Sequence, residues 1–391
     1  MSKYNFATNS IHGKNKNNPE GAINPPIFMT SSFCFDSLAE VDNAFNSVEG
    51  GYIYTRGNNP TLKALEEKMA ILSQGSGAIA FSSGMAGIST LLFSLLNPGD
   101  SVVTHNMIYG SSYNFLNNML PEKGIEVNFY NLNSSNLAKK LSKNTDLIYF
   151  ETPVNPTLKI IDIEKVVDIA QEYDITVVMD NTFATPYLQR PLEMGVDYVV
   201  HSATKYISGH GDAVGGIVVA KDADHLDDLR FEYMSEHGGV MSPFNAWLML
   251  RGLKTLKLRM KQHQQNADKI ARFLDSHRLV KQVYYPGLKE FSGNKIASRQ
   301  MDGFGGMLSF ELKLPINKIE KFLQNLDIIC LAVSLGDAET LIEVPARMTH
   351  RNYEEEKLQK MGITDNLLRI SAGLEECEDL IEDLARALDN V

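Results

Sequence analysis

The sequence predicts an α/β protein with one large, mainly parallel sheet of seven strands that helices cover on both faces. Two observations indicate this fold. Between residues 61 and 250, short apolar segments alternate with segments of helical spacing, as in chains that wind strand and helix in turn. These segments are apolar throughout rather than alternating, which is typical of strands buried on both faces. After residue 250 the pattern changes, and it predicts a smaller C-terminal α+β domain.

The elements follow in chain order. The expected strands of the large sheet are residues 78–81, 101–104, 126–130, 147–151, 176–180, 197–202 and 216–220. The expected helices are residues 60–72, 84–96, 111–120, 163–173, 255–276 and 376–388, and residues 304–312 alternate like a strand. The first 60 residues are rich in Asn, Gly and Pro and predict an extended arm with one helix near 37–48. We therefore divide the chain into an arm (1–60), a large domain (61–250) and a C-terminal domain (251–391).

The bulk composition excludes several classes of partner. The net charge of −11 argues against nucleic acid and anionic membranes, which require basic surfaces. No apolar segment approaches the length of a membrane span, and the N-terminus has no apolar signal core. The three cysteines lie far apart and show neither metal-site nor disulfide spacing, which indicates a reducing compartment. We expect a cytoplasmic protein that holds no metal, in which His210 and Asp212 stabilise a turn.

A lysine and an acid stand at the ends of two expected strands. Lys205 follows the strand at 197–202, and Asp180 ends the strand at 176–180. Open α/β sheets bind ligands at the carboxyl ends of their strands. A lysine there suits a Schiff-base nucleophile. Together the two residues fit pyridoxal 5'-phosphate (PLP), whose aldehyde takes the lysine and whose ring nitrogen takes the carboxylate.

A phosphate site is expected beside the lysine. Ser83, Gly84 and Met85 lie at the junction of the strand at 78–81 and the helix that begins at residue 84. Amide groups at a helix N-terminus bind phosphate, and glycine lets the backbone come close. Ser202 and Thr204, next to Lys205, carry hydroxyls that could bind the same anion.

The segment from Ser202 to Asp212 resembles the PLP-lysine signature of the Cys/Met-metabolism enzymes. The resemblance extends, in order, over nearly the whole chain through residues 54–56, 82–85, 151–156, 180–183, 334–336 and 369–375. It implies PLP-dependent transferase fold type I and assigns roles at the cofactor. Asp180 would keep the ring nitrogen protonated, Tyr109 would stack on the ring and assist proton transfer, and Asn155 would bind the phenolic oxygen.

The resemblance also implies an oligomer. The Tyr54 and Arg56 pair of the arm would reach the phosphate of a neighbouring subunit, in a dimer that pairs into a tetramer. Arg369 would bind the α-carboxylate of a small amino-acid substrate, with Ser334 at the same subsite. Lys205 would first hold the cofactor, then act as a base on the α-proton.

Within the family, the chain is most similar to the methionine γ-lyases. Relatives that process cystathionine often carry acids where this chain has Val333 and Ile53, and an apolar wall suits a methylthio group better. The resemblance therefore implies γ-elimination of L-methionine to 2-oxobutanoate, ammonia and a thiol. Ser111 departs from that pattern, because these lyases usually have a cysteine there. Cleavage of cystathionine, γ-replacement on an O-acylhomoserine, and PLP binding without turnover remain alternatives.

Overall fold

The computed structural model describes residues 3–13, 21–46, 50–141 and 145–391. A seven-stranded sheet forms the centre of the molecule, in the order β1-β7-β6-β5-β4-β2-β3. Its strands are β1 (Gly77–Phe81), β2 (Ser101–His105), β3 (Glu126–Tyr130), β4 (Leu147–Glu151), β5 (Thr176–Asp180), β6 (Tyr198–Ser202) and β7 (Gly216–Ala220). The neighbours from β6 to β3 are parallel, whereas β7 is antiparallel to both β1 and β6. The predicted mainly parallel sheet is confirmed.

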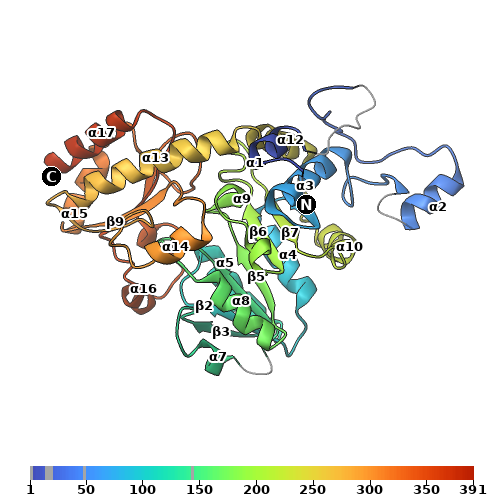
Figure 1. Ribbon diagram of the computed structural model, residues 1–391, viewed down its shortest axis with the longest axis horizontal. Coiled ribbons are helices and arrows are strands. Elements are labelled where there is room, and N and C mark those ends of the chain that lie inside the picture. The colour runs from blue at the N-terminus through green and yellow to red at the C-terminus, as the bar shows by residue number, and fades with distance from the viewer. Residues whose placement is uncertain (1–2, 14–20, 47–49, 142–144) are drawn as a thin grey trace.

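Helices cover the large sheet on both faces (Figure 1). In this part of the chain the helical segments are α3 (Pro60–Ser73), α4 (Gly84–Leu95), α5 (Gly110–Asn114), η2 (Phe115–Met119), α6 (Leu120–Glu122), α7 (Leu137–Lys140), α8 (Ile163–Glu172), α9 (Thr185–Leu188), η3 (Pro191–Met194), α10 (Leu226–Asp228), η4 (Leu229–Met234), α11 (Ser235–His237) and α12 (Pro243–Leu253). The helix expected at 111–120 is thus irregular, since its middle is a π-helical turn.

A second, five-stranded sheet follows, in the order β10-β11-β12-β9-β8. Its strands are β8 (Val280–Tyr284), β9 (Met307–Leu312), β10 (Cys330–Leu331), β11 (Leu341–Glu343) and β12 (Leu367–Ser371). The helices of this region are α13 (Leu256–Asp275), α14 (Asn294–Gln300), α15 (Ile316–Gln324), η5 (Pro345–Arg347), α16 (Glu355–Met361) and α17 (Cys377–Asp389). The long helix α13 runs from this sheet back to the centre of the molecule (Figure 1).

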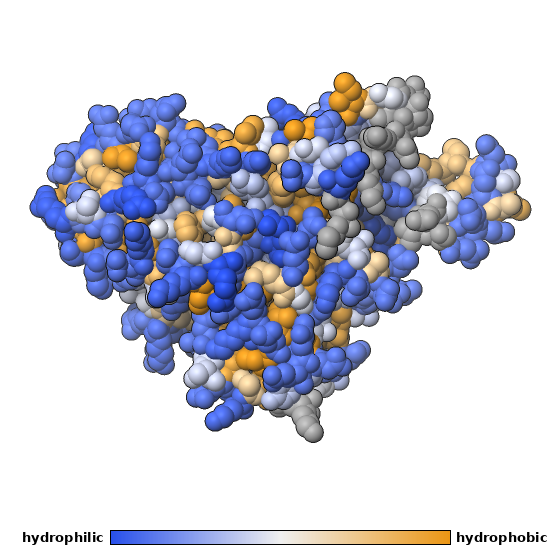
Figure 2. Space-filling model, viewed as in Figure 1, coloured by the Kyte–Doolittle hydropathy of each residue, from blue (hydrophilic) through white to orange (hydrophobic). Residues whose placement is uncertain are grey.

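The N-terminal segment lies partly against the body and partly away from it. Helix α1 (Phe6–Ile11) packs on α3, and α2 (Leu38–Asn46) projects outward (Figure 1). The helix expected near 37–48 is therefore present, although residues 47 and 48 lie outside the described residues. Apolar side chains are exposed along this arm, whereas most of the face shown in Figure 2 is hydrophilic.

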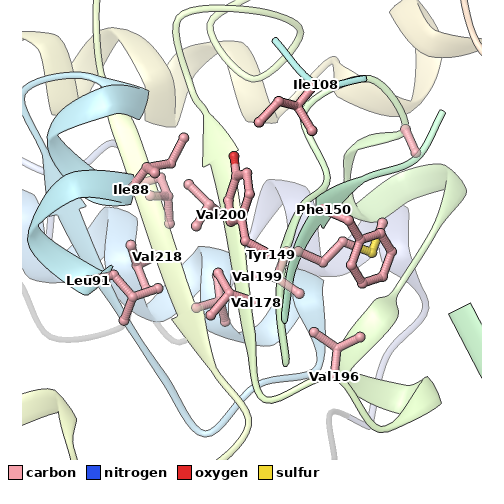
Figure 3. Packing of buried hydrophobic residues seen from close by; sticks show 14 of the residues in the cluster. Ile88, Leu91, Ile108, Tyr149, Phe150, Val178, Val196, Val199, Val200 and Val218 are labelled. Carbon is pink, nitrogen blue, oxygen red and sulfur yellow. The ribbon is translucent and has the colours of Figure 1, made fainter. Parts of the chain in front are cut away.

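Two buried hydrophobic clusters support the two sheets. The larger one joins α4 to the central strands, where Ile88 and Leu91 of the helix meet Val218, Val200 and Tyr149 of the sheet (Figure 3). It holds α4 against β6 and β7, so that Gly84 at the start of the helix meets Ser202 at the carboxyl end of β6. None of the helices in the described part of the chain combines the length and apolar composition that a membrane span requires.

Candidate active site

A cavity of about 290 Å³ opens at the carboxyl edge of the large sheet. Residues from both sheets line it: Ser83, Gly84, Met85, Ile88, Tyr109, Glu151, Pro153, Asn155, Asp180, Thr182, Phe183, Ser202, Thr204, Lys205, Val333, Ser334, Leu335, Thr349 and Arg369. Twelve of the residues predicted from the sequence are among them. The cavity lies where doubly wound sheets place their ligands.

The N-terminus of α4 forms one end of this cavity. Ser83 is its N-cap, and the Ser83 side chain accepts a hydrogen bond from the Ala86 backbone N–H at 3.1 Å. Gly84 packs tightly on β6, because an added Cβ would lie 3.0 Å from the Ser202 Cβ and 3.1 Å from its Cα. Only glycine lets the chain approach so closely, and the amide groups of the first turn remain directed at the cavity.

Thr204 lines the same end but has a structural partner. Its hydroxyl donates to the Gly215 carbonyl at 3.2 Å and accepts from the Gly215 N–H at 3.0 Å. In this arrangement Thr204 closes the loop that leads into β7. Its expected hydrogen bond to an anion would require the hydroxyl to turn away from the Gly215 carbonyl.

Lys205 projects into the cavity from the turn after β6. Its Nζ donates to the Ser334 Oγ at 2.8 Å, so an amine from the large sheet meets a hydroxyl from the loop after β10. Ser334 has a φ of +94°, a backbone conformation that costs a non-glycine residue energy. Burial lowers the pKa of Lys205, and the nearby Arg369 lowers it further. More of the amine is therefore neutral, and hence nucleophilic, than in a solvated lysine.

Asp180 lies at the base of the cavity, where β5 ends. Its Oδ1 accepts a hydrogen bond from the Thr182 backbone N–H at 2.9 Å. Burial raises the pKa of Asp180. Among the ion pairs of the described residues, none involves Asp180. Burial disfavours the charged form of a carboxylate and a positive neighbour restores it, so this position suits a cationic ring nitrogen.

A buried arginine closes the other end. Arg369 of β12 pairs with Glu343 of β11, with 3.1 Å between Nη1 and Oε1 and both side chains at most 2% exposed. Its Nη1 also donates to the Asn155 Oδ1 at 2.9 Å, and its Nη2 donates to the Ser334 carbonyl at 2.9 Å. Three elements thus hold the guanidinium in place, while its Nε has no protein partner. A guanidinium fixed in this way can bind a carboxylate in one orientation.

Three predicted residues lie outside the cavity lining. Tyr54 and Arg56 are on the arm, where the guanidinium carbon lies 5.7 Å from the centre of the Tyr54 ring. Ser111 is in the first turn of α5, two residues after Tyr109. His210 and Asp212 lie in the turn after Lys205, where each forms a hydrogen bond with Ser208.

Sequence reasoning missed Glu151, Thr182 and Thr349, which line the cavity, and Glu343 behind Arg369. Glu151 ends β4 beside Asp180, its partner in the parallel register. Its position at the carboxyl end of a buried strand was the same signal that identified Asp180. Glu343 and Thr349 gave no such signal, because β11 has only three residues and Thr349 lies in a loop.

Known proteins resemble the chain over its whole length. A family model described as Cys/Met metabolism PLP-dependent enzyme matches residues 7–389. The chain belongs to this family. It is 46% identical over 396 residues to the L-methionine gamma-lyase of Fusobacterium nucleatum subsp. nucleatum, a match that covers 100% of both chains. The cystathionine gamma-lyase of Bacillus subtilis is 44% identical over 372 residues, which cover 95% of each chain.

A solved structure shows the same fold with a cofactor. The putative O-acetylhomoserine (thiol)-lyase from Campylobacter jejuni subsp. jejuni carries a pyridoxyl-lysine monophosphate. It matches this structure with a TM-score of 0.95 at 34% identity, covering 99% of this chain and 100% of that one. The family recognised from the sequence, its fold and its cofactor are thereby confirmed. The protein is a PLP-dependent enzyme of sulfur amino-acid metabolism.

The cavity of this chain offers a partner for the phosphate, the aldehyde and the ring nitrogen of PLP. The glycine-containing turn at Gly84 suits the phosphate, and the amine of Lys205, whose pKa burial lowers, suits the aldehyde. The carboxylate of Asp180 suits the protonated ring nitrogen. These groups converge on one cavity although they come from α4, from β5 and from the turn after β6.

Proposed function

We propose that this protein is a carbon–sulfur lyase that cleaves L-methionine by γ-elimination. One water is consumed, and 2-oxobutanoate, ammonia and methanethiol are released. The similarity to L-methionine gamma-lyases over the full chain supports this activity. The observation that carries the choice of substrate is Val333, an apolar residue that lines the cavity directly beside Ser334.

Arg369 would bind the carboxylate of the amino acid and so fix its orientation. The carboxylate can take the free Nε edge of the guanidinium, since Nη1 already contacts Glu343 and Asn155. Orientation matters because the bond to be broken at Cα must align with the cofactor's π system, which serves as the electron sink when PLP is bound. Asp180 would hold the proton on the ring nitrogen that this role requires.

Lys205 would carry the protons. Its lowered pKa favours the neutral amine, which can take the proton from Cα and then from Cβ. The Ser334 hydroxyl keeps the Nζ at this side of the cavity through the 2.8 Å hydrogen bond. Tyr109, which lines the cavity from the loop before α5, would supply a proton to the departing sulfur.

Val333 would form the wall for the methylthio group. A distal ammonium or carboxylate next to this side chain would gain no charged partner, and the part of it that leaves water would lose solvation. A thioether loses little. The preference for methionine over cystathionine would therefore arise from the absence of a charged partner at this position.

The test is 2-oxobutanoate release by the purified, PLP-loaded protein with L-methionine as the sole substrate. We expect stoichiometric 2-oxobutanoate and ammonia, and none from the Lys205→Ala variant prepared in the same way. If methionine gives no product while cystathionine does, the proposed substrate is wrong.

Cystathionine cleavage is the second candidate. The 44% identity to the cystathionine gamma-lyase of Bacillus subtilis supports it, as does Ser111, which replaces the cysteine usual in methionine γ-lyases. γ-Replacement on an O-acylhomoserine would use the same groups for its first half. Competition between methionine and cystathionine in one reaction, with both thiol products measured, ranks the two lyase activities directly.

The protein would work as a homotetramer, a dimer of dimers, in the cytoplasm. Tyr54 is 48% exposed and lies outside its own cavity, which supports a role for Tyr54 and Arg56 at the phosphate of a neighbouring subunit. The arm at 1–60 would serve this contact, with 61–250 binding the cofactor and 251–391 completing the substrate site. Light scattering should give about four times the 43.6 kDa chain mass.

A further inference from the structure

Glu151 holds two loops of the active site with one carboxylate. Its Oε2 accepts a hydrogen bond from the Tyr109 backbone N–H at 3.0 Å, and its Oε1 accepts one from the Asn155 backbone N–H at 2.8 Å. Tyr109 belongs to the loop after β2, and Asn155 to the loop after β4. Strand β4 lies next to β2 in the sheet, so a side chain at its end is placed to reach both loops.

Each of these loops presents a side chain to the cavity. Tyr109 and Asn155 both line it. Asn155 is also hydrogen-bonded to Arg369, because its Oδ1 accepts from the Arg369 Nη1. Arg369 in turn contacts the carbonyl of Ser334, whose hydroxyl accepts from Lys205. A continuous set of hydrogen bonds therefore connects Glu151 to the amine on the opposite side of the cavity.

The position is costly for a carboxyl group. Glu151 is 6% exposed and stands beside Asp180, its register partner on β5. Burial and the charge of Asp180 raise the pKa of Glu151 to about 8, and the two backbone N–H groups oppose this rise. Two buried acids side by side destabilise the empty cavity electrostatically. A geometric role that needs two acceptor oxygens explains why an acid occupies the site.

We propose that Glu151 is a positioning residue of the active site, whose carboxylate fixes the loops that place Tyr109 and Asn155 against bound PLP. The inference rests on PLP binding at this cavity and is independent of which sulfur amino acid is cleaved. The role assigned to Glu151 is geometric, because each of its two oxygens accepts a hydrogen bond from a backbone N–H group of a different loop.

The test compares two changes at Glu151 with one at the opposite end of the same sheet. Glu151→Gln keeps the length of the side chain but directs an NH₂ group at one backbone N–H, which leaves a buried donor unpaired. Glu151→Asp keeps both oxygens but is one methylene too short to reach both loops. Asp197→Asn is the matched control, because Asp197 accepts from the Val177 N–H at 2.8 Å at the amino ends of the strands, away from the cavity.

The readouts are the PLP dissociation constant of the apoprotein and the visible circular dichroism of the bound cofactor. We expect both Glu151 variants to bind PLP about tenfold more weakly, the loss of about one buried hydrogen bond, with a weakened dichroism band. Asp197→Asn should match the wild type in both. The proposal is overturned if Glu151→Gln binds PLP like the wild type with the same dichroism, or if Asp197→Asn shows the same losses. Should Glu151→Gln fail to fold, as judged by far-ultraviolet dichroism, the Glu151→Asp variant decides by the same criteria.

Discussion

Replacing Glu343 with glutamine should destabilise the empty enzyme and at the same time strengthen its binding of amino acids. Glu343 is the buried counter-ion of Arg369, with 3.1 Å between the paired atoms and almost no solvent contact on either side chain. Burial lowers the pKa of Arg369, and Glu343 is the strongest group that opposes this. The Glu343→Gln change keeps the shape of the side chain, removes its charge and replaces one acceptor oxygen by an NH₂ group.

The expected loss of stability follows from the distance between the charges of Arg369 and Glu343. At 3.1 Å, two unit charges attract each other by about 5 kcal/mol at an effective dielectric constant of about 20. Removing one partner of a buried pair typically costs about 3 kcal/mol of folding free energy, because the other charge remains unpaired. A substrate carboxylate would restore a counter-ion. If about 1.4 kcal/mol of the lost energy returns on binding, the dissociation constant falls about tenfold.

Two measurements with opposite expected signs test this reasoning. The first is the thermal midpoint of the apoprotein, which should fall in Glu343→Gln. The second is the dissociation constant of L-norleucine, which has no sulfur to eliminate, followed through the absorbance of the bound cofactor. Glu311→Gln on β9 of the same sheet is the control, since its partner Lys281 is exposed and the pair contributes little. Weaker norleucine binding in Glu343→Gln would refute the charge argument and assign Glu343 to orienting Arg369.

The remaining predictions concern the cofactor and the distal pocket. Lys205→Ala should lose the visible absorbance of covalently bound PLP together with all turnover, and retained turnover would remove Lys205 from the mechanism. Gly84→Ala should raise the PLP dissociation constant at least about tenfold, because its Cβ would press on Ser202; an unchanged constant would show that the turn can move. Val333→Glu should shift the ratio of kcat/KM values toward cystathionine, and an unchanged ratio contradicts the apolar-wall argument. The rate of covalent PLP uptake by the apoprotein should rise with pH and level off below the pH at which a free lysine analogue does, since burial lowers the pKa of Lys205.

The sequence predicted the large sheet closely, because strands buried on both faces are apolar throughout. The bounds of β3, β4, β5 and β7 agree with the expected ranges, and the others differ by one residue at an end. The antiparallel direction of β7 was not predicted, since an apolar run is the same in either direction. Of the second sheet only β9 was expected. Strands β10 and β11 have two and three residues, too few to show any periodicity.

The candidate site was predicted where strand ends or family motifs marked it. Lys205 and Asp180 follow from the rule that ligands bind at the carboxyl ends of parallel strands, and the structure places both at one cavity. The side-chain contacts that hold the other cavity residues in place could not be predicted from the sequence. Glu151 contacts Tyr109 across 42 residues of chain, and Glu343 meets Arg369 only because β11 and β12 pair. Such contacts depend on the packed structure rather than on local sequence.

The wide separation of the cavity residues along the chain has a consequence for how the enzyme matures. Asn155 and Arg369 touch although they are 214 positions apart in the sequence, and Lys205 and Ser334 are 129 positions apart. During synthesis, the segment that carries Asp180 and Lys205 emerges well before the strand that carries Arg369. A half-made chain therefore contains all seven strands of the large sheet and Lys205, but it lacks Ser334 and Arg369, which complete the pocket around that amine. PLP should consequently bind only after the last strand has been synthesised. The newly completed chain should then depend on the cellular PLP supply, because PLP binding stabilises the folded protein.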